Sequence, residues 1–416
     1  MKSSKYFLIA IISFTVCLNA QWTNTGGPPT SRSNQALVTN GLNIFSGTNG
    51  GMVRSTQGGG SWLNIDNGLG SYTNIRCVIY SPNYLNQDGS LICGTTSGGI
   101  FNSNDYGDQW TAFPNDTLNI PGSPNVNSII SYLDAVWIGT DKGVFYHRFE
   151  GSWYSKNLGL PSASDTKVLS LIVKDGHFFV GTEYGVYKLS NQYWSEKNNG
   201  LLNTNVVALT YSGQYLIAVC AQGSNEGVYI SSDDGENWTY SFSVAFPTSL
   251  LAIGQNIFVG SFGDGVWLST NNGSTWNQIN DGFAGSAYYV LSLAANEDDV
   301  FAGTNAAGVW KRPLSQIISD VDDERAISPL SYSLEQNYPN PFNPSTIISF
   351  SIPVESFVSL RVFNSIGEEA ANLVNETKPA GNYSVSFYAG RLPSGIYFYK
   401  IAAGDFIQTR KMMLVK

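Results

Sequence analysis

The chain is poor in histidine, cysteine and charged residues. It has two histidines and four cysteines in 416 residues, and they do not cluster, so we expect no transition-metal site and no cofactor. Calcium bound by loop carboxylates stays open, because that ion needs only oxygen ligands. Charged residues make up 13% of the chain, about half the usual share, and with many Gly, Asn, Ser and aromatic residues this composition suits short strands joined by tight turns.

Long hydrophobic runs are also missing. The longest, residues 6–17, has twelve largely apolar residues, whereas a membrane-spanning helix needs about 20. Lys2 and Lys5 precede this run and Ala20 follows it, a pattern typical of a signal peptide over residues 1–20 that is cleaved before Gln21. The sequence therefore predicts export and no transmembrane segment in the mature chain.

Positive charge is scarce in residues 21–312. This segment has 12 Lys and Arg against 21 Asp and Glu, which accounts for the net charge of −9. Because such a balance repels phosphate backbones, nucleic acid is not an expected partner.

What the sequence does have is an internal repeat. Seven segments share an apolar strand, a Gly-Thr-like step, a short loop, and then glycine followed by apolar and aromatic residues. Repeats of roughly 40–45 residues that each read as four strands are typical of β-propeller blades. The sequence predicts an all-β protein with a seven-bladed propeller over residues 21–312. The second glycine of the seven repeats is Gly51, Gly99, Gly143, Gly185, Gly227, Gly265 and Gly308.

Four blades continue into the pattern Ser-x-Asp-x-Gly-x-x-Trp. This resembles the Asp-box of bacterial-neuraminidase-type repeats in sialidase-like propellers, and the resemblance implies a structural turn on the outer rim. The Asp or Asn oxygen would accept backbone N–H groups, glycine would take positive φ, and tryptophan would pack between blades. Two copies depart from the pattern, with Gln57 in the first blade and Asn271 in the sixth. The residues expected to build these turns are Ser103, Asp105, Gly107, Trp110, Ser231, Asp233, Gly235, Trp238, Asn271, Gly273 and Trp276.

The seventh blade has no fourth strand of its own after Trp310. Gln21-Trp22-Thr23 stands where an outer strand would precede the first blade. We expect this segment to close the ring by completing the seventh blade, since closure leaves no exposed edge. An open or six-bladed ring is the alternative.

No catalytic constellation is recognisable. Sialidases clamp a carboxylate with three arginines, and the five arginines of residues 21–312 do not form that pattern. Instead, the variable loops joining the second to the third strand, and the fourth strand to the next blade, share one face and carry aromatics beside carboxylates. Such a face suits a glycan or protein ligand, although each aromatic could simply pack under its loop. The candidate binding residues in the short loops are Asp141, Glu183, Tyr184, Phe262 and Asp264, and longer loops add Phe113, Phe246, Phe283, Tyr288 and Tyr289.

Three functions follow as hypotheses. We expect a ligand-binding or adhesion module first, a glycoside hydrolase using loop carboxylates second, and a structural surface-layer component third. Cys77 and Cys93 flank a predicted hairpin and could form a disulfide after export, or remain small buried thiols.

After an acidic linker at residues 313–330, the 43-residue period ends. Alternating segments in residues 331–416 predict a small immunoglobulin-like β-sandwich. The stretches beginning at Tyr338, Ala380, Leu392 and Lys411 resemble the type IX secretion system sorting domain of Bacteroidetes and their relatives. That resemblance implies recognition by an outer-membrane translocon, frequent removal of the domain, and a protein that is secreted or attached to the outer surface.

Overall fold

The computed structural model describes residues 21–28, 31–81, 90–113, 125–133, 135–148, 152–162, 165–317, 332–337, 340–390, 392–404 and 406–415. The predicted signal peptide and residues 318–330 of the predicted linker lie outside these residues.

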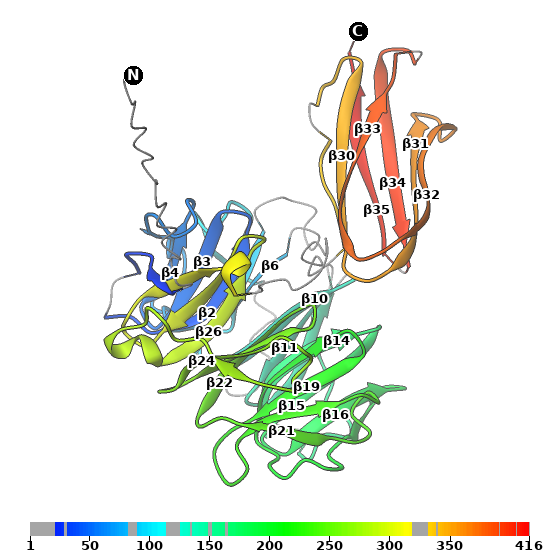
Figure 1. Cartoon of the computed structure of the whole chain (residues 1–416). Helices are drawn as coiled ribbons and strands as arrows, with labels where there is room; N and C mark the ends of the chain where they lie inside the picture. Colours follow the sequence, from blue (N-terminus) through cyan, green and yellow to red (C-terminus); the bar gives the residue numbers. More distant parts are fainter. Residues whose placement is uncertain are drawn as a thin grey trace, which may run out of the picture.

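Seven four-stranded antiparallel sheets form a closed ring (Figure 1). The first strands of neighbouring sheets contact one another in the cycle β2, β6, β10, β14, β18, β22, β26 and back to β2. This cycle is the seven-bladed propeller that the repeat predicts. The strands of the seven blades are β2 (Asn34–Asn40), β3 (Asn43–Thr48), β4 (Gly51–Ser55) and β5 (Leu63–Asn64); β6 (Ile75–Tyr80), β7 (Leu91–Thr95), β8 (Ile100–Ser103) and β9 (Thr111–Ala112); β10 (Val126–Tyr132), β11 (Ala135–Thr140), β12 (Gly143–Arg148) and β13 (Trp153–Ser155); β14 (Val168–Lys174), β15 (His177–Thr182), β16 (Gly185–Ser190) and β17 (Tyr193–Glu196); β18 (Val206–Ser212), β19 (Tyr215–Cys220), β20 (Gly227–Ser231) and β21 (Thr239–Ser243); β22 (Pro247–Ile253), β23 (Asn256–Ser261), β24 (Gly265–Ser269) and β25 (Asn277–Gln278); and β26 (Val290–Ala295), β27 (Asp299–Thr304) and β28 (Val309–Pro313) with β1 (Thr23–Asn24).

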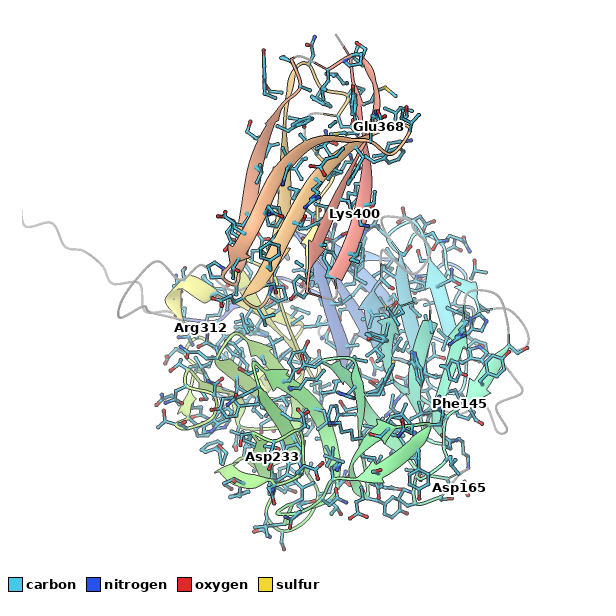
Figure 2. All side chains as sticks on the ribbon, turned by 90° about the vertical axis from the view of Figure 1, so that its right-hand side faces the viewer. Phe145, Asp165, Asp233, Arg312, Glu368 and Lys400 are labelled. Carbon is cyan, nitrogen blue, oxygen red and sulfur yellow. The ribbon has the colours of Figure 1, made fainter. Side chains whose placement is uncertain are left out.

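The glycine of the Gly-Thr step lets neighbouring blades approach closely. A Cβ atom at Gly94 would lie 2.6 Å from Cγ1 of Val126, the first residue of the next inner strand. A Cβ atom at Gly139 would lie equally close, 2.6 Å from Cγ1 of Val168. Any larger residue would therefore push the two blades apart, which explains why this glycine recurs around the ring. Figure 2 shows side chains filling the spaces between neighbouring sheets.

The N-terminal segment closes the ring, as the sequence predicts. In the seventh blade β1 pairs antiparallel with β28, with Thr23 opposite Lys311 and Asn24 opposite Trp310. The preceding Trp22 is 1% exposed, and its ring stacks on Phe283 with centroids 4.8 Å apart. The first strand of the ring therefore completes its last blade.

The turns between the third and fourth strands are held by their own side chains. In the fifth blade the Ser231 hydroxyl donates to Asp233 Oδ1 at 2.8 Å and accepts the Gly235 N–H at 2.8 Å. Asp233 Oδ1 also accepts the Asn237 N–H at 2.9 Å. The corresponding bonds are present around Ser103 and Asp105 in the second blade, and around Ser269 and Asn271 in the sixth.

The two cysteines of the second blade do not form a disulfide. Cys77 stands opposite Gly94 and Val78 opposite Cys93, so the two thiols project from opposite faces of the sheet. Both thiols are free. Burial raises the pKa of Cys77 to about 12, which keeps that thiol neutral and inert at physiological pH.

The C-terminal unit is a β-sandwich. One sheet has the order β29 (Ser333–Leu334), β30 (Ser345–Ile352), β33 (Gly381–Tyr388), and the other has β32 (Glu369–Lys378), β31 (Ser356–Asn364), β34 (Gly395–Ala403), β35 (Phe406–Leu414). Alternate residues of β30, β31 and β34 are buried between the sheets. This arrangement agrees with the immunoglobulin-like sandwich that the alternating sequence predicts.

Candidate ligand-binding face

One face of the ring is built by the turns between second and third strands. In the fourth blade the Thr182 hydroxyl donates to the Gly185 carbonyl at 2.9 Å and accepts the Tyr184 N–H at 3.0 Å. These bonds close a tight turn that leaves Glu183 and Tyr184 exposed. The recurring Thr and Gly thus fix short, rigid turns on this face, and longer connections stand above them.

The fifth blade departs from this pattern. Its second and third strands, β19 and β20, are joined by residues 221–226 instead of a two-residue turn. Its last strand reaches the sixth blade through only residues 244–246, whereas residues 197–205 make the same connection between the fourth and fifth blades. The short connection brings Phe246 to the start of inner strand β22, at the loop-bearing end of the ring.

Phe246 adopts an unusual backbone conformation. Its φ is 45°, in the left-handed region that bulky residues rarely enter, and it is 62% exposed. Burial of the aromatic ring would be one reason to keep Phe246 in this backbone conformation, but the ring faces solvent. A strained, exposed aromatic is a feature that clusters at functional sites.

Glu226 fixes this conformation. Its Oε2 accepts the Phe246 N–H at 2.9 Å, and its Oε1 accepts the Gly223 N–H at 3.2 Å. The Glu226 carbonyl in turn accepts the Tyr240 hydroxyl at 2.9 Å. One carboxylate therefore connects the 221–226 loop to the 244–246 connection.

Phe246, Phe262 and Tyr289 form an aromatic cluster. The Phe262 N–H donates to the Phe246 carbonyl at 2.9 Å, and Phe262 pairs with Tyr289 in an isolated β-bridge. The Phe262 and Tyr289 rings are 4.8 Å apart between centroids and inclined at 52°. They are 41% and 40% exposed, so the fifth, sixth and seventh blades together present three rings to solvent.

The other predicted binding residues are spread around the face. Asp141 lies in the third blade, where its two oxygens accept the amides of Asn125 at 2.6 Å and Asn127 at 2.8 Å. Glu183 and Tyr184 lie in the fourth blade. Asp264 follows Phe262 in the same turn, and its backbone carbonyl accepts the Asn280 amide at 2.6 Å.

The aromatics predicted in the longer loops divide into two groups. Phe113 and Phe283 are 4% and 7% exposed and pack against the rings of Trp153 and Trp22, which agrees with the alternative interpretation that the aromatics are buried. Tyr288 is partly buried against the same core. Phe246 and Tyr289 are exposed and belong to the aromatic cluster. Glu226 was not predicted from the sequence, because its partner Phe246 is twenty residues away.

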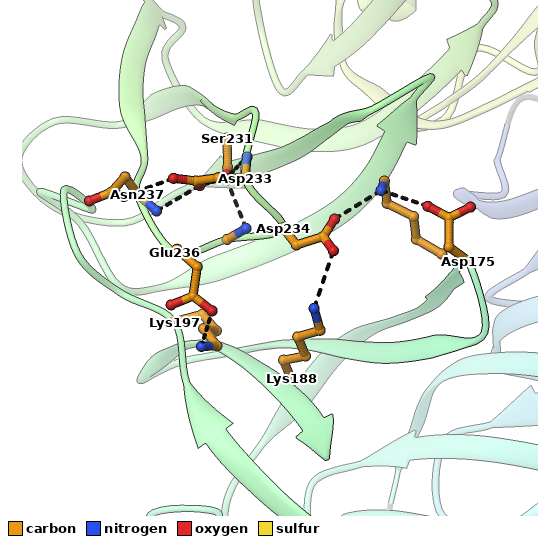
Figure 3. A network of polar contacts seen from close by, with 10 residues as sticks. Asp175, Lys188, Lys197, Ser231, Asp233, Asp234, Glu236 and Asn237 are labelled. Carbon is orange, nitrogen blue, oxygen red and sulfur yellow. Dashed lines mark hydrogen bonds and ion pairs between the residues drawn. The ribbon is translucent and has the colours of Figure 1, made fainter.

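The carboxyl groups whose pKa is lowered lie elsewhere, in the turns between third and fourth strands. Figure 3 shows Asp234 between two lysines, with Oδ1 2.9 Å from Lys174 Nζ and Oδ2 3.2 Å from Lys188 Nζ. The bond from Lys174 lowers the pKa of Asp234, and the bonds from Asn237 lower the pKa of Asp233. Asp234 is a structural group that connects the fourth and fifth blades, and Asp233 holds the turn of its own blade.

Two further observations limit the chemistry. Across the part of the chain that the structure describes, no three His, Cys, Asp or Glu side chains gather to hold a metal ion. Within the same residues no helix is long and apolar enough to cross a membrane.

Comparison with solved structures agrees with the propeller fold. The extracellular domain of BT3049 from B. thetaiotaomicron is 13% identical with a TM-score of 0.55, covering 95% of this chain and 57% of that one. A GH74 enzyme from Niastella koreensis is 13% identical with a TM-score of 0.51, covering 95% and 75%. YCF48 bound to D1 peptide is 14% identical with a TM-score of 0.52, covering 71% and 94%. This chain thus spans little more than half the length of the BT3049 domain, and likeness at such identities shows the fold alone. No curated protein matches the chain.

The fold therefore defines a seven-bladed β-propeller followed by a β-sandwich. Residues 336–416 match the family of the secretion system C-terminal sorting domain. The sandwich is that sorting domain, and it directs the protein through the type IX secretion machinery to the cell surface or the medium.

Proposed function

We propose that the propeller is a ligand-binding module displayed outside the cell, and that it contacts its ligand through the aromatic cluster of Phe246, Phe262 and Tyr289. The observation that carries the proposal is Phe246, which is left-handed, exposed and held by the Glu226 carboxylate. A strained backbone costs about 1–3 kcal/mol, and it persists only where the surroundings impose it. Partly exposed aromatic rings beside carboxylates are a usual composition for a binding surface.

Binding is favoured over glycoside hydrolysis by the state of the loop carboxylates. A hydrolase needs one carboxyl group to donate a proton and a second as base or nucleophile. Both oxygens of Glu226 accept backbone N–H groups, and both oxygens of Asp141 accept asparagine amides. Because these bonds engage both oxygens of each carboxylate in holding the backbone or neighbouring amides, the two residues suit positioning more than proton transfer. The likeness to YCF48 bound to D1 peptide is compatible with binding by this fold.

The remaining assignments complete the proposal. Residues 1–20 would be a signal peptide and residues 21–312 the propeller. Residues 313–330 would be a linker, and residues 331–416 the sorting domain. The serine-centred turns would be Asp-boxes of the sialidase-like type, since the hydrogen bonds around Ser103, Ser231 and Ser269 are equivalent in three blades.

The test is a screen for ligands with matched variants of the purified full chain. Peptide and oligosaccharide libraries are bound to the parent protein, to Phe262→Ala and to Glu226→Gln. Tyr154→Ala is the control, because Tyr154 is 50% exposed and lies in outer strand β13, away from the aromatic cluster. We expect ligands whose binding falls at least about tenfold in Phe262→Ala and is unchanged in Tyr154→Ala. Ligands that bind all variants equally, or hydrolysis of an oligosaccharide at enzyme-like rates, would contradict the proposal.

A further inference from the structure

The fifth and sixth blades of the ring contain no positively charged side chain of their own, and the seventh has only Lys311 and Arg312 in its last strand, β28. Between Lys197 and Lys311 the sequence runs for 113 residues without lysine, arginine or histidine. These residues include all of the strands from β18 to β27, hence the fifth and sixth blades and most of the seventh. The same stretch has nine carboxylates, namely Glu226, Asp233, Asp234, Glu236, Asp264, Asp281, Glu297, Asp298 and Asp299.

Some of this negative charge is neutralised by lysines outside the stretch. Lys174 and Lys188 pair with Asp234, Lys197 pairs with Glu236, and Lys311 pairs with Asp299. None of these pairs involves the carboxylates at the aromatic cluster. Glu226 bonds to the backbone of Phe246, and Asp264 lies two residues after Phe262. The exposed rings therefore stand in a strongly negative part of the surface.

The arrangement of the two rings also favours positive charge at this surface. Phe262 and Tyr289 meet at 52° with centroids 4.8 Å apart, and both remain about two-fifths exposed. Each ring face carries the negative part of an aromatic quadrupole, which attracts a cation within about 6 Å of the centroid. Ring faces and carboxylates thus favour positive charge at the same place.

We infer that the aromatic cluster binds a polypeptide segment rich in arginine or lysine, with a cationic side chain over Phe262 and Tyr289 and the Glu226 and Asp264 carboxylates beside it. The inference rests on the proposed function and specifies its ligand. A neutral sugar would gain nothing from the surrounding charge, and an anionic polymer would be repelled by it. An extended peptide places alternate side chains about 7 Å apart on one side, so a peptide of alternating Arg and Ala presents a row of cations to the cluster.

The experiment uses three twelve-residue peptides as probes: alternating Arg and Ala, the same peptide with Gln for Arg, and the same with Glu for Arg. Neutral hexasaccharides of glucose and xylose complete the set. Affinities for the full chain are measured by isothermal titration calorimetry at 50 and 500 mM NaCl. We expect the Arg peptide to bind, with at least about tenfold weaker binding of the Gln peptide, and a several-fold loss at high salt.

Matched variants distinguish binding at the aromatic cluster from general electrostatic attraction to the negative surface. Phe262→Ala and Glu226→Gln are each expected to weaken the Arg peptide about tenfold. Glu297→Gln removes the same charge from the same three blades, but at the exposed turn between β26 and β27, which is at the opposite end of the inner strand from Tyr289. It is expected to bind like the parent. Thermal unfolding of each variant shows whether it is folded.

The outcomes are distinct. If the Arg peptide fails to bind, or if Glu297→Gln weakens it as much as Glu226→Gln, the inference is overturned. Binding of a neutral hexasaccharide that depends on Phe262 would overturn the inference and leave the proposed function standing. If no probe depends on Phe262, both are overturned.

Discussion

The indole N–H of Trp22 donates a hydrogen bond to the carbonyl of Ile279 at 2.6 Å, across 257 residues of sequence. The backbone N–H of Trp22 also donates to the backbone carbonyl of Asp281 at 2.6 Å. Trp110, Trp194 and Trp238 make the same indole bond to Ile65, Lys156 and Lys197 of the blades before them. Trp22 is therefore the outer-strand tryptophan of the seventh blade, supplied from the other end of the ring.

The first prediction is that Trp22→Ala destabilises the ring as much as loss of an internal tryptophan. The substitution opens a cavity against Phe283 and leaves the Ile279 carbonyl without this donor. We expect the free energy of unfolding to fall by about 3–5 kcal/mol, measured by chemical denaturation. Trp194→Ala is the matched comparison, because Trp194 is equally buried. A loss below about 1 kcal/mol in Trp22→Ala alone would mean that closure contributes little.

The second prediction is that Asp233 is a turn residue without a part in binding. Asp233→Ala removes the acceptor for Asn237 and Ser231 and should cost about 1 kcal/mol of stability. Asp233→Asn should cost less, since Asn271 fills this position in the sixth blade and accepts the Thr275 N–H at 2.9 Å. Calorimetric melting gives the stabilities. A folded Asp233→Ala that no longer binds the ligand of the parent would show that the opposite face also takes part.

The third prediction concerns acid. The pKa of Asp234 is lowered from 3.8, mainly by the bond from Lys174, so its ionised form is favoured by folding. The contribution is complete above about pH 4 and is lost as the pH falls through the folded-state pKa. We expect the unfolding free energy to decline as the pH falls below about 4. In Asp234→Asn this decline should be shallower, and an unchanged slope would mean that the Lys174 pair is not coupled to folding.

The fourth prediction separates folding from export. A chain ending near Pro329 lacks the sorting domain but keeps every strand of the propeller, so we expect it to fold and to stay in the periplasm. The linker with residues 331–416 should in turn carry an unrelated, signal-bearing reporter to the surface of a host with this machinery. Cell fractionation and limited proteolysis of both proteins provide the measurement. Surface display of the truncated chain at the normal level would contradict the sorting role.

The fifth prediction is that the sorting domain is removed from the exported protein. The mature form should be about 9 kDa lighter than the precursor without its signal peptide, which is the share of the 45.1 kDa chain that residues 331–416 carry. Mass spectrometry of surface material tests this. Recovery of peptides beginning at Lys411 on the main species would contradict removal.

The sequence predicts the ring well because the repeat is local. The Gly-Thr step recurs in most blades, and Trp110, Trp194 and Trp238 make the same contact with the blade before them, so the pattern repeats along the chain. One recurring position was nevertheless not predicted. After the outer strand of four blades it is occupied by a glycine: Gly68, Gly159, Gly200 and Gly282. A Cβ at Gly282 would lie 2.2 Å from the Trp22 carbonyl, and each of the four glycines has positive φ. The recurring Asn-x-Gly or Asp-x-Gly before an apolar residue was the signal that could have found it.

The aromatic cluster was predicted only in part, for physical reasons. Phe262 was a candidate because it lies in a short loop of the variable face. Phe113 and Phe283 were candidates from longer loops of the same face, yet both are buried. The role of Glu226 depends on the left-handed backbone of Phe246, and that conformation follows from the lengths of two separate connections. Such a contact has no local pattern that a sequence could reveal.

The position of the closing strand has a mechanical consequence. The chain leaves the propeller from β28 toward the sorting domain, and β28 lies between β27 and the two-residue strand β1. A pull on the sorting domain during translocation is thus transmitted first to the seventh blade. There β28 is held by five residue pairs on one side and two on the other. Because β1 follows directly after Trp22, the burial of that side chain strengthens the strand pair on which such a pull would act.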